Sequence, residues 1–252
     1  MVMTVGGTRQ KLFMIATVTH QGKTRWMIID NSFLDAELGA YKQVEWDVAA
    51  PLLRSLTPDM LCMADRGFVG YAHWQAGLRT GAQLLWRMPK SLILPVEKTL
   101  DDGSYLSSLY PSASDRKKRI NGIAVRVIEY TLPQVSDSEP MYRLLTTLHN
   151  EKVAPAHALA TLYHERWEVE LVFDELKTHL AQRRRVLRSK TPELVRQEFY
   201  GWVMAHYAVR WLMYQGATRA GIPERALSFA ANVQLLRRNL PHAGVIPPCA
   251  PK

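Results

Sequence analysis

Four side chains between positions 163 and 177 have the chemistry and the spacing of a helical binding face. Tyr163, Arg166, Glu170 and Lys177 follow one another at intervals of three, four and seven residues. At the pitch of an α-helix, these intervals place the four side chains within an arc of roughly 60°. Apolar residues of the same segment occupy the adjoining arc. A helix there would bury one side and present, at its rim, a carboxylate flanked by two cations and a phenol.

A second carboxylate follows a short apolar segment. Met60–Ala64 predicts a buried strand that ends at Asp65, Arg66 and Gly67. The carboxyl ends of sheet strands are where α/β proteins usually hold their ligands, which makes Asp65 a candidate site residue. The alternative is that Asp65 only caps a helix or a turn, because Asp is common in turns that contain Gly.

The elements that must position these residues predict an α/β fold with a mixed sheet and flanking helices. Strands are predicted at 11–20, 25–30, 60–64 and 84–88, and helices at 44–56, 71–79, 156–180, 191–217 and 227–240. The first two strands form a hairpin, and Pro51 shortens or kinks the first helix. Thr191 and Pro192 fit the cap and the first position of their helix. Its apolar and aromatic residues favour core packing, with His206 as a packed core histidine.

Residues 89–149 favour a β-rich insertion, or an edge of the sheet that is extended by hairpins. Strand-like segments at 92–100, 123–132 and 142–148 alternate with turn-rich ones. The basic run Arg116–Arg119 lies in a turn-rich segment and is either a solvated loop or a phosphate contact. The chain is therefore divided into a core at 1–88 and 150–190, the insertion at 89–149, and a helical C-terminal region at 191–252.

Composition restricts the partners and the compartment. The chain has 252 residues and a formal net charge of +9, which favours a polyanionic partner, although charge alone is weak evidence. The segment 182–190 (QRRRVLRSK) is strongly basic and contributes Arg183, Arg184, Arg185 and Arg188. Two cysteines far apart in the chain argue against a disulfide framework. No apolar run is long enough to span a membrane and no signal segment is present, so we expect a cytoplasmic protein.

Together these residues resemble a known group of enzymes. The segment Ala64–Phe68 (ADRGF), followed by Tyr163, Arg166, Glu170 and Lys177 at those intervals, is similar to the DDE transposases of bacterial insertion sequences. The likeness is to the insertion-sequence-four family, which is marked by its Tyr-Arg-Glu-Lys spacing. It covers nearly the whole chain.

The resemblance implies a ribonuclease-H-like fold and a two-metal site. Three carboxylates of such enzymes hold two Mg²⁺ or Mn²⁺ ions, which activate a water or a DNA 3′-hydroxyl for in-line attack on a phosphodiester. Asp65 and Glu170 would be the second and third catalytic and metal-binding carboxylates, on the order of 4–8 Å apart. Asp174, one turn beyond Glu170, is a weaker candidate.

The resemblance also implies how the chain would hold DNA. Tyr163, Arg166 and Lys177 would contact DNA phosphates, and the four arginines of the segment 182–190 add further DNA-binding candidates. The implied partner is the double-stranded DNA of transposon ends and target, bound by a homodimer in the bacterial cytoplasm at the nucleoid.

The first carboxylate departs from the family pattern. In this fold it lies on the first strand, ahead of the hairpin, yet MVMTVGGTRQ contains no Asp. We therefore expect a chain that lacks its N-terminal DNA-binding region and first strand, and that is weak or inactive. Asp30, at the end of RWMIID, is the alternative for this missing ligand, although it aligns with the third strand rather than the first. Three functions follow: a transposase that cleaves and transfers DNA strands, a non-catalytic DNA-binding remnant of one, and a metal-dependent nuclease.

Overall fold

The chain forms two compact units in a computed structural model. The structure describes residues 2–5, 10–13, 17–20, 26–28, 35, 37–40, 44–132, 139–164, 175–180, 191–223 and 226–240. The first unit comprises Met1–Thr4, Gln10–Ile29 and Phe33–Val169, and the second comprises Val5–Arg9, Asp30–Ser32 and Glu170–Lys252. None of the helices in these described parts is long and apolar enough to cross a membrane.

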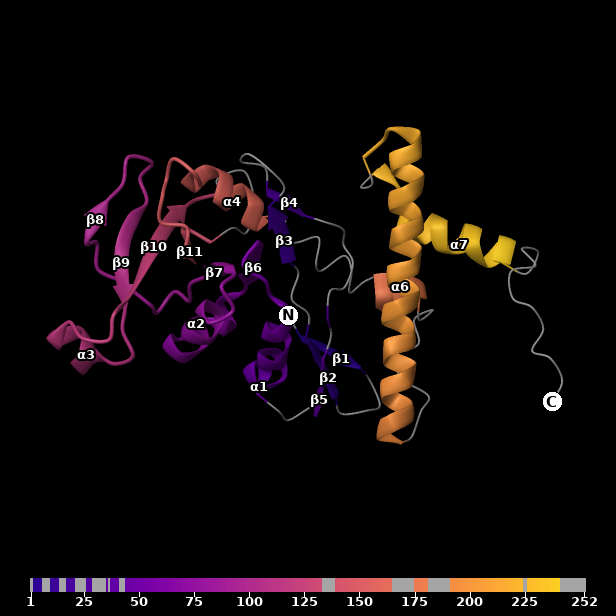
Figure 1. Ribbon diagram of the computed structural model, residues 1–252, viewed down its shortest axis with the longest axis horizontal. Helices are drawn as coiled ribbons and strands as arrows, with labels where there is room; N and C mark the ends of the chain where they lie inside the picture. Colours follow the sequence, from indigo (N-terminus) through magenta and orange to yellow (C-terminus); the bar gives the residue numbers. More distant parts are fainter. Residues whose placement is uncertain are drawn as a thin grey trace. The chain divides into compact units, whose positions relative to one another are not determined.

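A mixed sheet forms the first unit, which confirms the α/β class (Figure 1). In the described residues it has eight strands in the order β4-β3-β6-β7-β11-β10-β9-β8. Their bounds are β3 Thr17–His20, β4 Trp26–Ile28, β6 Met60–Ala64, β7 Gln83–Arg87, β8 Lys98–Thr99, β9 Tyr105–Leu109, β10 Ile123–Tyr130 and β11 Tyr142–Thr146. Only β6 and β7 run parallel among the paired strands described, and the other pairs are antiparallel.

The alternation of side chains along β6 and β7 builds a core on both faces of the sheet. Cys62, Leu84 and Trp86 point to one face, where helix α2 (Tyr71–Leu78) contributes the fully buried Trp74. Leu61 and Leu85 point to the other face, where helix α4 (Ala156–His164) packs. Because successive residues of a strand face opposite sides, strands that are apolar throughout must be covered on both faces.

The N-terminal strands differ from the prediction in one respect. The predicted hairpin is present, since β3 pairs with β4 antiparallel and opposes Val18 to Ile28. The single strand predicted at 11–20 is wrong, because its first part is the separate strand β2 (Gln10–Phe13). That strand belongs to a small sheet with β1 (Val2–Val5) and β5 (Glu37–Ala40), in the order β1-β2-β5. β2 takes β5 as its partner, whereas β3 takes β6.

Pro51 and Gly77 shape the helices that flank the sheet. Helix α1 (Glu45–Ala49) ends ahead of Pro51 and continues as the 3₁₀ helix η1 (Ala50–Ser55), as expected from a residue that lacks an N–H. Gly77 lets α2 approach β7 closely. A Cβ on it would lie 2.9 Å from Leu84 Cδ1 and 3.3 Å from Trp86.

Strands β8–β11 continue the sheet beyond β7, and three expectations for this region are wrong. The strand predicted at 92–100 is reduced to Lys98–Thr99, because Pro95 cannot donate to a neighbouring strand. β9 lies in a segment expected to be turns, and its inward Ser107 donates a hydrogen bond to the Pro95 carbonyl over 2.6 Å. The basic run at 116–119 is not a loop but largely helix α3 (Ala113–Lys118), capped by Ser112. The division of the chain at 89, 150 and 191 stays a prediction.

Helices form the described part of the second unit: the π-helix η3 (Glu175–Leu180), α6 (Pro192–Ala220) and α7 (Phe229–Asn239). The predicted cap of α6 is confirmed, since the Thr191 side chain accepts a hydrogen bond from the Leu194 N–H. Core packing of α6 is confirmed only for one face, where Val209 and Met213 meet Phe229 of α7. The opposite stripe is between 40% and 70% exposed and comprises Tyr200, Met204, Tyr207, Trp211 and Tyr214.

A buried ionic cluster joins η3 to α6 in this unit. Glu175 accepts hydrogen bonds from Arg210, with Nε at 3.1 Å, and from His206 Nε2 at 2.8 Å. His206 is fully buried and stacks on Phe229, with ring centroids 5.0 Å apart. The expectation of a packed core histidine is therefore confirmed, with the addition of a buried carboxylate partner.

The burial of His206 makes the stability of this unit depend on pH. Burial disfavours the charged imidazolium and lowers the pKa of His206, although the hydrogen bond with Glu175 opposes this. The unfolded chain takes up a proton near the ordinary histidine pKa of about 6.5. We therefore expect neutral His206 to contribute fully to the unfolding free energy above about pH 6.5. Below this pH, the unfolding free energy should fall by at most about 1.4 kcal/mol per pH unit.

Urea unfolding at about pH 7.5 and about pH 5.5 measures this contribution. His206→Gln serves as the matched variant, because its amide N–H can still donate to Glu175 but takes up no proton. The wild-type protein should lose more unfolding free energy over this interval than His206→Gln does. Equal losses in the two proteins would assign the pH dependence to other groups.

Candidate functional site

Asp65 lies directly after β6, where the buried strand reaches the edge of the sheet. Leu61 is fully buried, whereas 39% of the Asp65 side chain is exposed. The carboxylate accepts a hydrogen bond from the Arg66 N–H over 2.8 Å and caps the 3₁₀ helix η2 (Arg66–Phe68). Asp65 therefore does cap a turn, and its role as a catalytic residue stays a prediction. The cap leaves the carboxylate accessible to a ligand.

Arg87 lies beside Asp65 because of the parallel pairing of β6 and β7. Ala64 is opposite Trp86 in this pair, so the next residue of each strand lies at the same edge. Arg87 Nη1 is 3.9 Å from Asp65 Oδ1, and its guanidinium lies over the Tyr142 ring at 4.9 Å. Burial works to lower the pKa of Arg87, but hydrogen bonding and charge from Glu139 outweigh it and raise that pKa. Arg87 therefore stays a cation at this edge.

Glu139 brings a second carboxylate to the same edge. Arg87 Nη2 lies 2.8 Å from Glu139 Oε1, and Arg66 Nη1 lies 3.3 Å from the same oxygen. Lys90 Nζ is 3.7 Å from Glu139 Oε2. The Glu139 backbone N–H also donates to the Tyr142 hydroxyl over 3.1 Å. Three cations thus surround one carboxylate next to Asp65.

Tyr163 connects the helical motif to the strand that carries Asp65. Its side chain is 5% exposed in the core between α4 and the sheet. The hydroxyl donates a hydrogen bond to the Ala64 carbonyl over 3.2 Å. Tyr163, the first residue of the second part of the pattern, is therefore in contact with Ala64 of the first part, nearly a hundred residues earlier in the chain. A phosphate contact of Tyr163 stays a prediction.

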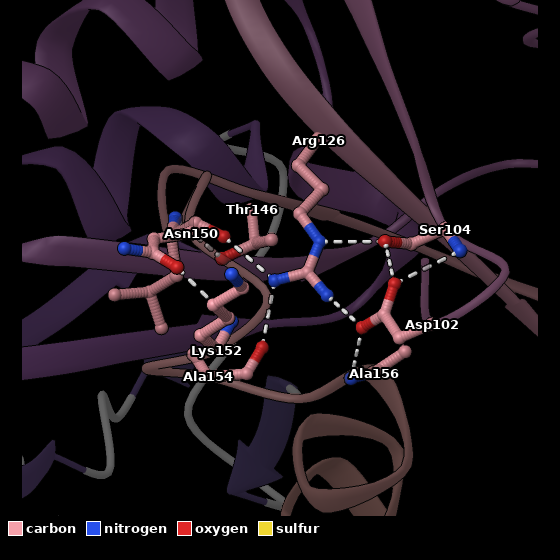
Figure 2. A network of polar contacts seen from close by, with 9 residues as sticks. Asp102, Ser104, Arg126, Thr146, Asn150, Lys152, Ala154 and Ala156 are labelled. Carbon is pink, nitrogen blue, oxygen red and sulfur yellow. Dashed lines mark hydrogen bonds and ion pairs between the residues drawn. The ribbon is translucent and has the colours of Figure 1, made fainter. Parts of the chain in front are cut away.

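A buried ionic network sets the start of α4 (Figure 2). Arg126 of β10 is fully buried and donates to Ser104 Oγ at 2.8 Å and to the Ala154 carbonyl at 2.7 Å. It also pairs with Asp102, whose carboxylate accepts the Ala156 N–H at the first residue of α4 over 2.7 Å. Partial burial works to raise the pKa of Asp102, but hydrogen bonds from Ser104 and Ala156 and the charge of Arg126 outweigh it and lower that pKa. The helix that carries Tyr163 is thus anchored at its N-terminus.

Most of the residues predicted for the site lie outside the described residues. These residues are Asp30, Arg166, Glu170, Asp174, Arg183, Arg184, Arg185 and Arg188. Lys177 belongs to η3, where only its backbone is described. The distance between the Asp65 and Glu170 carboxylates and the roles of these residues in metal or DNA binding stay predictions.

The metal-binding expectation rests on Asp65 alone within the described part of the chain. No group of three or more His, Cys, Asp and Glu side chains that could hold a metal ion is found among the described residues. The Asp65 carboxylate is a hard, accessible oxygen donor and fits Mg²⁺ or Mn²⁺ as one ligand of a larger set. Cys62 offers no ligand, because burial raises the pKa of its thiol to about 12.

Sequence reasoning found Asp65 and Tyr163 but missed Arg87, Lys90 and Glu139. Arg87 could have been found, because it is the first charged residue after the apolar run Leu84–Trp86, as Asp65 is after Met60–Ala64, and two parallel strands bring their ends together. Glu139 has no such signal. It lies in a polar segment, PQVSDSEP, from which no local pattern selects one carboxylate.

Comparison with known proteins gives two matches. The sequence model of the family described as "Transposase DDE domain" matches residues 14–208, a range that includes Asp65 and Tyr163. The chain is 30% identical over 208 residues to the transposase InsG for insertion sequence element IS4 from Escherichia coli (strain K12). That alignment covers 81% of the chain and 47% of the relative. The chain thus spans about half the length of the curated relative that it matches.

Proposed function

The chain belongs to the DDE transposase family, in the group of insertion sequence four, and we propose from this premise that it is a transposase catalytic domain. Its reaction would be metal-dependent cleavage of DNA at transposon ends and transfer of the strand to target DNA. The observation that carries the proposal is the hydrogen bond of 3.2 Å from Tyr163 to the Ala64 carbonyl. It joins α4, which carries the first residue of the Tyr-Arg-Glu-Lys pattern, to the strand end that presents Asp65.

We propose a ribonuclease-H-like fold for the first unit. The antiparallel hairpin β3–β4, followed by the parallel pair β6–β7 with α2 between them, supports this assignment. Asp65 then lies at the carboxyl end of an inner strand. This is the edge at which open α/β sheets place their ligands.

Asp65 and Glu170 are the residues that we propose to hold the divalent ion. When bound, Mg²⁺ or Mn²⁺ would supply an activated water or 3′-hydroxyl and would stabilise the leaving oxygen. Asp65 contributes a carboxylate that η2 holds in place through the Arg66 N–H. Tyr163 holds α4, which precedes Glu170 in the chain, against the end of β6. Oxygen ligands suit both ions, because they are hard cations.

The DNA partner follows from the same premise. Tyr163, Arg166 and Lys177, with the arginines at 183–185 and 188, are the proposed contacts to double-stranded DNA of the transposon ends and target. The proposed assembly on DNA is a homodimer. The formal net charge of +9 supports association with a polyanion.

One observation favours a second function, which is DNA binding without catalysis. Residues 1–29 contain no Asp or Glu, so the hairpin β3–β4 supplies no third carboxylate. A site with two carboxylates holds two metal ions less firmly than one with three. In this case the chain would bind DNA in a salt-dependent way and leave it intact.

A DNA-processing assay separates the functions. The chain is incubated with a duplex that carries the element's end and with a target duplex, in Mg²⁺, in Mn²⁺ or in EDTA. The transposase proposal expects a nicked end and a joined product in metal and neither in EDTA. Cut DNA without joined product would indicate a nuclease. Intact DNA in both metals, with salt-dependent binding, would support the non-catalytic function.

Glu170→Ala and Glu193→Ala form the matched pair for this assay. Glu170→Ala should lose the product, whereas Glu193→Ala, in the first turn of α6, should retain it. If Glu170→Ala cleaves as well as the wild-type chain does, the assignment of Glu170 to the metal site is wrong.

A further inference from the structure

The cations around Glu139 form an arrangement that the proposed mechanism does not use. Arg66, Arg87 and Lys90 come from three different segments, after β6, at the end of β7 and beyond it. Their nitrogens lie between 2.8 and 3.7 Å from the two carboxylate oxygens of Glu139. With Asp65 at the same edge, these three positive charges face two negative charges, which leaves an excess of one positive charge.

The group that they surround resembles a phosphodiester in charge and in hydrogen bonding. A carboxylate and a phosphodiester each carry one negative charge over two terminal oxygens. Arginine binds both with two parallel N–H donors, and lysine binds either as a point charge. Arg66 and Arg87 here donate to the same oxygen, and Lys90 approaches the other.

The position of the cluster connects it to the proposed reaction. Arg87 lies 3.9 Å from Asp65 Oδ1 and 2.8 Å from Glu139 Oε1, and therefore contacts both carboxylates. Arg66 follows Asp65 in the chain, and its backbone N–H is bound by the Asp65 carboxylate. An anion that replaces Glu139 would contact Arg87, which also contacts Asp65, the proposed metal ligand.

We propose that Arg66, Arg87 and Lys90 form a site for one DNA phosphodiester, which Glu139 occupies until DNA displaces it. The site deepens the proposed function and rests on it for the identity of the anion. Glu139 acts as an internal competitor. In the absence of DNA, it neutralises part of the positive charge at this edge. When DNA binds, Glu139 leaves and the three cations contact the phosphodiester.

The exposure of the cluster makes this exchange feasible. The side chains of Arg66 and Lys90 are 52% and 65% exposed, so their pairs with Glu139 are weak and screened by salt. Arg87 is more buried, at 17% exposure, and the Tyr142 ring holds its guanidinium. The arginine thus stays in place while the carboxylate leaves.

Glu139→Gln tests the proposal through DNA binding in EDTA. The probe is a fluorescently labelled duplex oligonucleotide, followed by anisotropy from about 50 to about 200 mM salt. The variant should bind about tenfold more tightly than the wild-type chain, because the anion site is open. The slope of log affinity against log salt should steepen by about 1, as expected for one additional phosphate contact.

Glu129→Gln is the matched control. Glu129 pairs with Arg143 over 2.7 Å on the neighbouring strands β10 and β11, so this change removes the same charge from another ion pair of the same sheet. It should leave the affinity within about twofold of wild type, since no cation cluster is opened. In a chain that already carries Arg66→Gln and Arg87→Gln, adding Glu139→Gln should not increase the affinity for DNA.

Two results would overturn the inference. One is a Glu139→Gln chain that binds DNA no more tightly than the wild type, with an unchanged melting curve to show that it is folded. The other is an equal gain in Glu129→Gln, which would reduce the effect to net charge. Because no metal is present, the outcome is independent of cleavage. A chain that cuts no DNA but shows the Glu139 effect would contradict the catalytic proposal alone.

Discussion

Replacing Asp65 with Asn is expected to lower the metal-dependent cleavage rate at least about a thousandfold, a loss of about 4 kcal/mol in transition-state stabilisation. The reason is that Asn keeps one role of the Asp65 side chain, which is to cap η2, and removes the other, which is to supply a negative charge to the metal ion. Asn caps a helix about as well as Asp, so the hydrogen bond from the Arg66 N–H and the turn at η2 should remain. The neutral amide, however, gives up the negative charge that a hard divalent cation requires.

Asp59→Asn is the matched control, because Asp59 lies ahead of β6 and Asp65 follows it. Asp59 is exposed and hydrogen-bonded to Thr57, away from the proposed site at the other end of the strand. Cleavage rates of both variants would be compared with wild type at several Mg²⁺ and Mn²⁺ concentrations, with circular dichroism to verify the fold. An Asp65→Asn chain that cleaves at the wild-type rate would leave Asp65 as a cap only.

The elements that sequence reasoning placed well are those in which one local pattern decides the outcome. MLCMA became β6 with unchanged bounds, because an apolar run of only five residues between turns favours a covered strand over a helix. Thr191 and Pro192 marked the start of α6 for reasons contained within one helical turn. The position of Asp65 at a strand end followed from the same local information.

The misplaced elements depended on partners far away in the chain. β9 was not predicted, because Ser107 and Ser108 interrupt its apolar pattern. The hydrogen bond from Ser107 to the Pro95 carbonyl, which explains how Ser107 can be buried, is visible only in the structure. The long apolar helix α6 suggested a core on all sides, yet packing covers one face and leaves Tyr207 and Trp211 exposed. The cation cluster around Glu139 likewise exists only after the sheet has brought β7 next to β6.

Asp102→Ala is expected to lower the unfolding free energy by about 3–5 kcal/mol. Arg126 is fully buried, and Asp102 is its only carboxylate ion-pair partner among the described residues. Without Asp102, a guanidinium would remain in the core with only neutral acceptors, at Ser104, Leu148 and Ala154. The Ala156 N–H at the start of α4 would lose its acceptor as well.

Asp101→Ala and a double variant distinguish the buried charge from a general defect. Asp101 is exposed beside Asp102, so its removal should change the unfolding free energy by less than about 0.5 kcal/mol. Adding Arg126→Met to Asp102→Ala should recover part of the loss, because the uncompensated charge is gone while an apolar side chain fills much of its volume. Chemical denaturation of all four proteins measures these differences. If Asp102→Ala unfolds at the wild-type midpoint, Arg126 is not held by this pair, and the anchoring of α4 rests on its apolar contacts with the sheet.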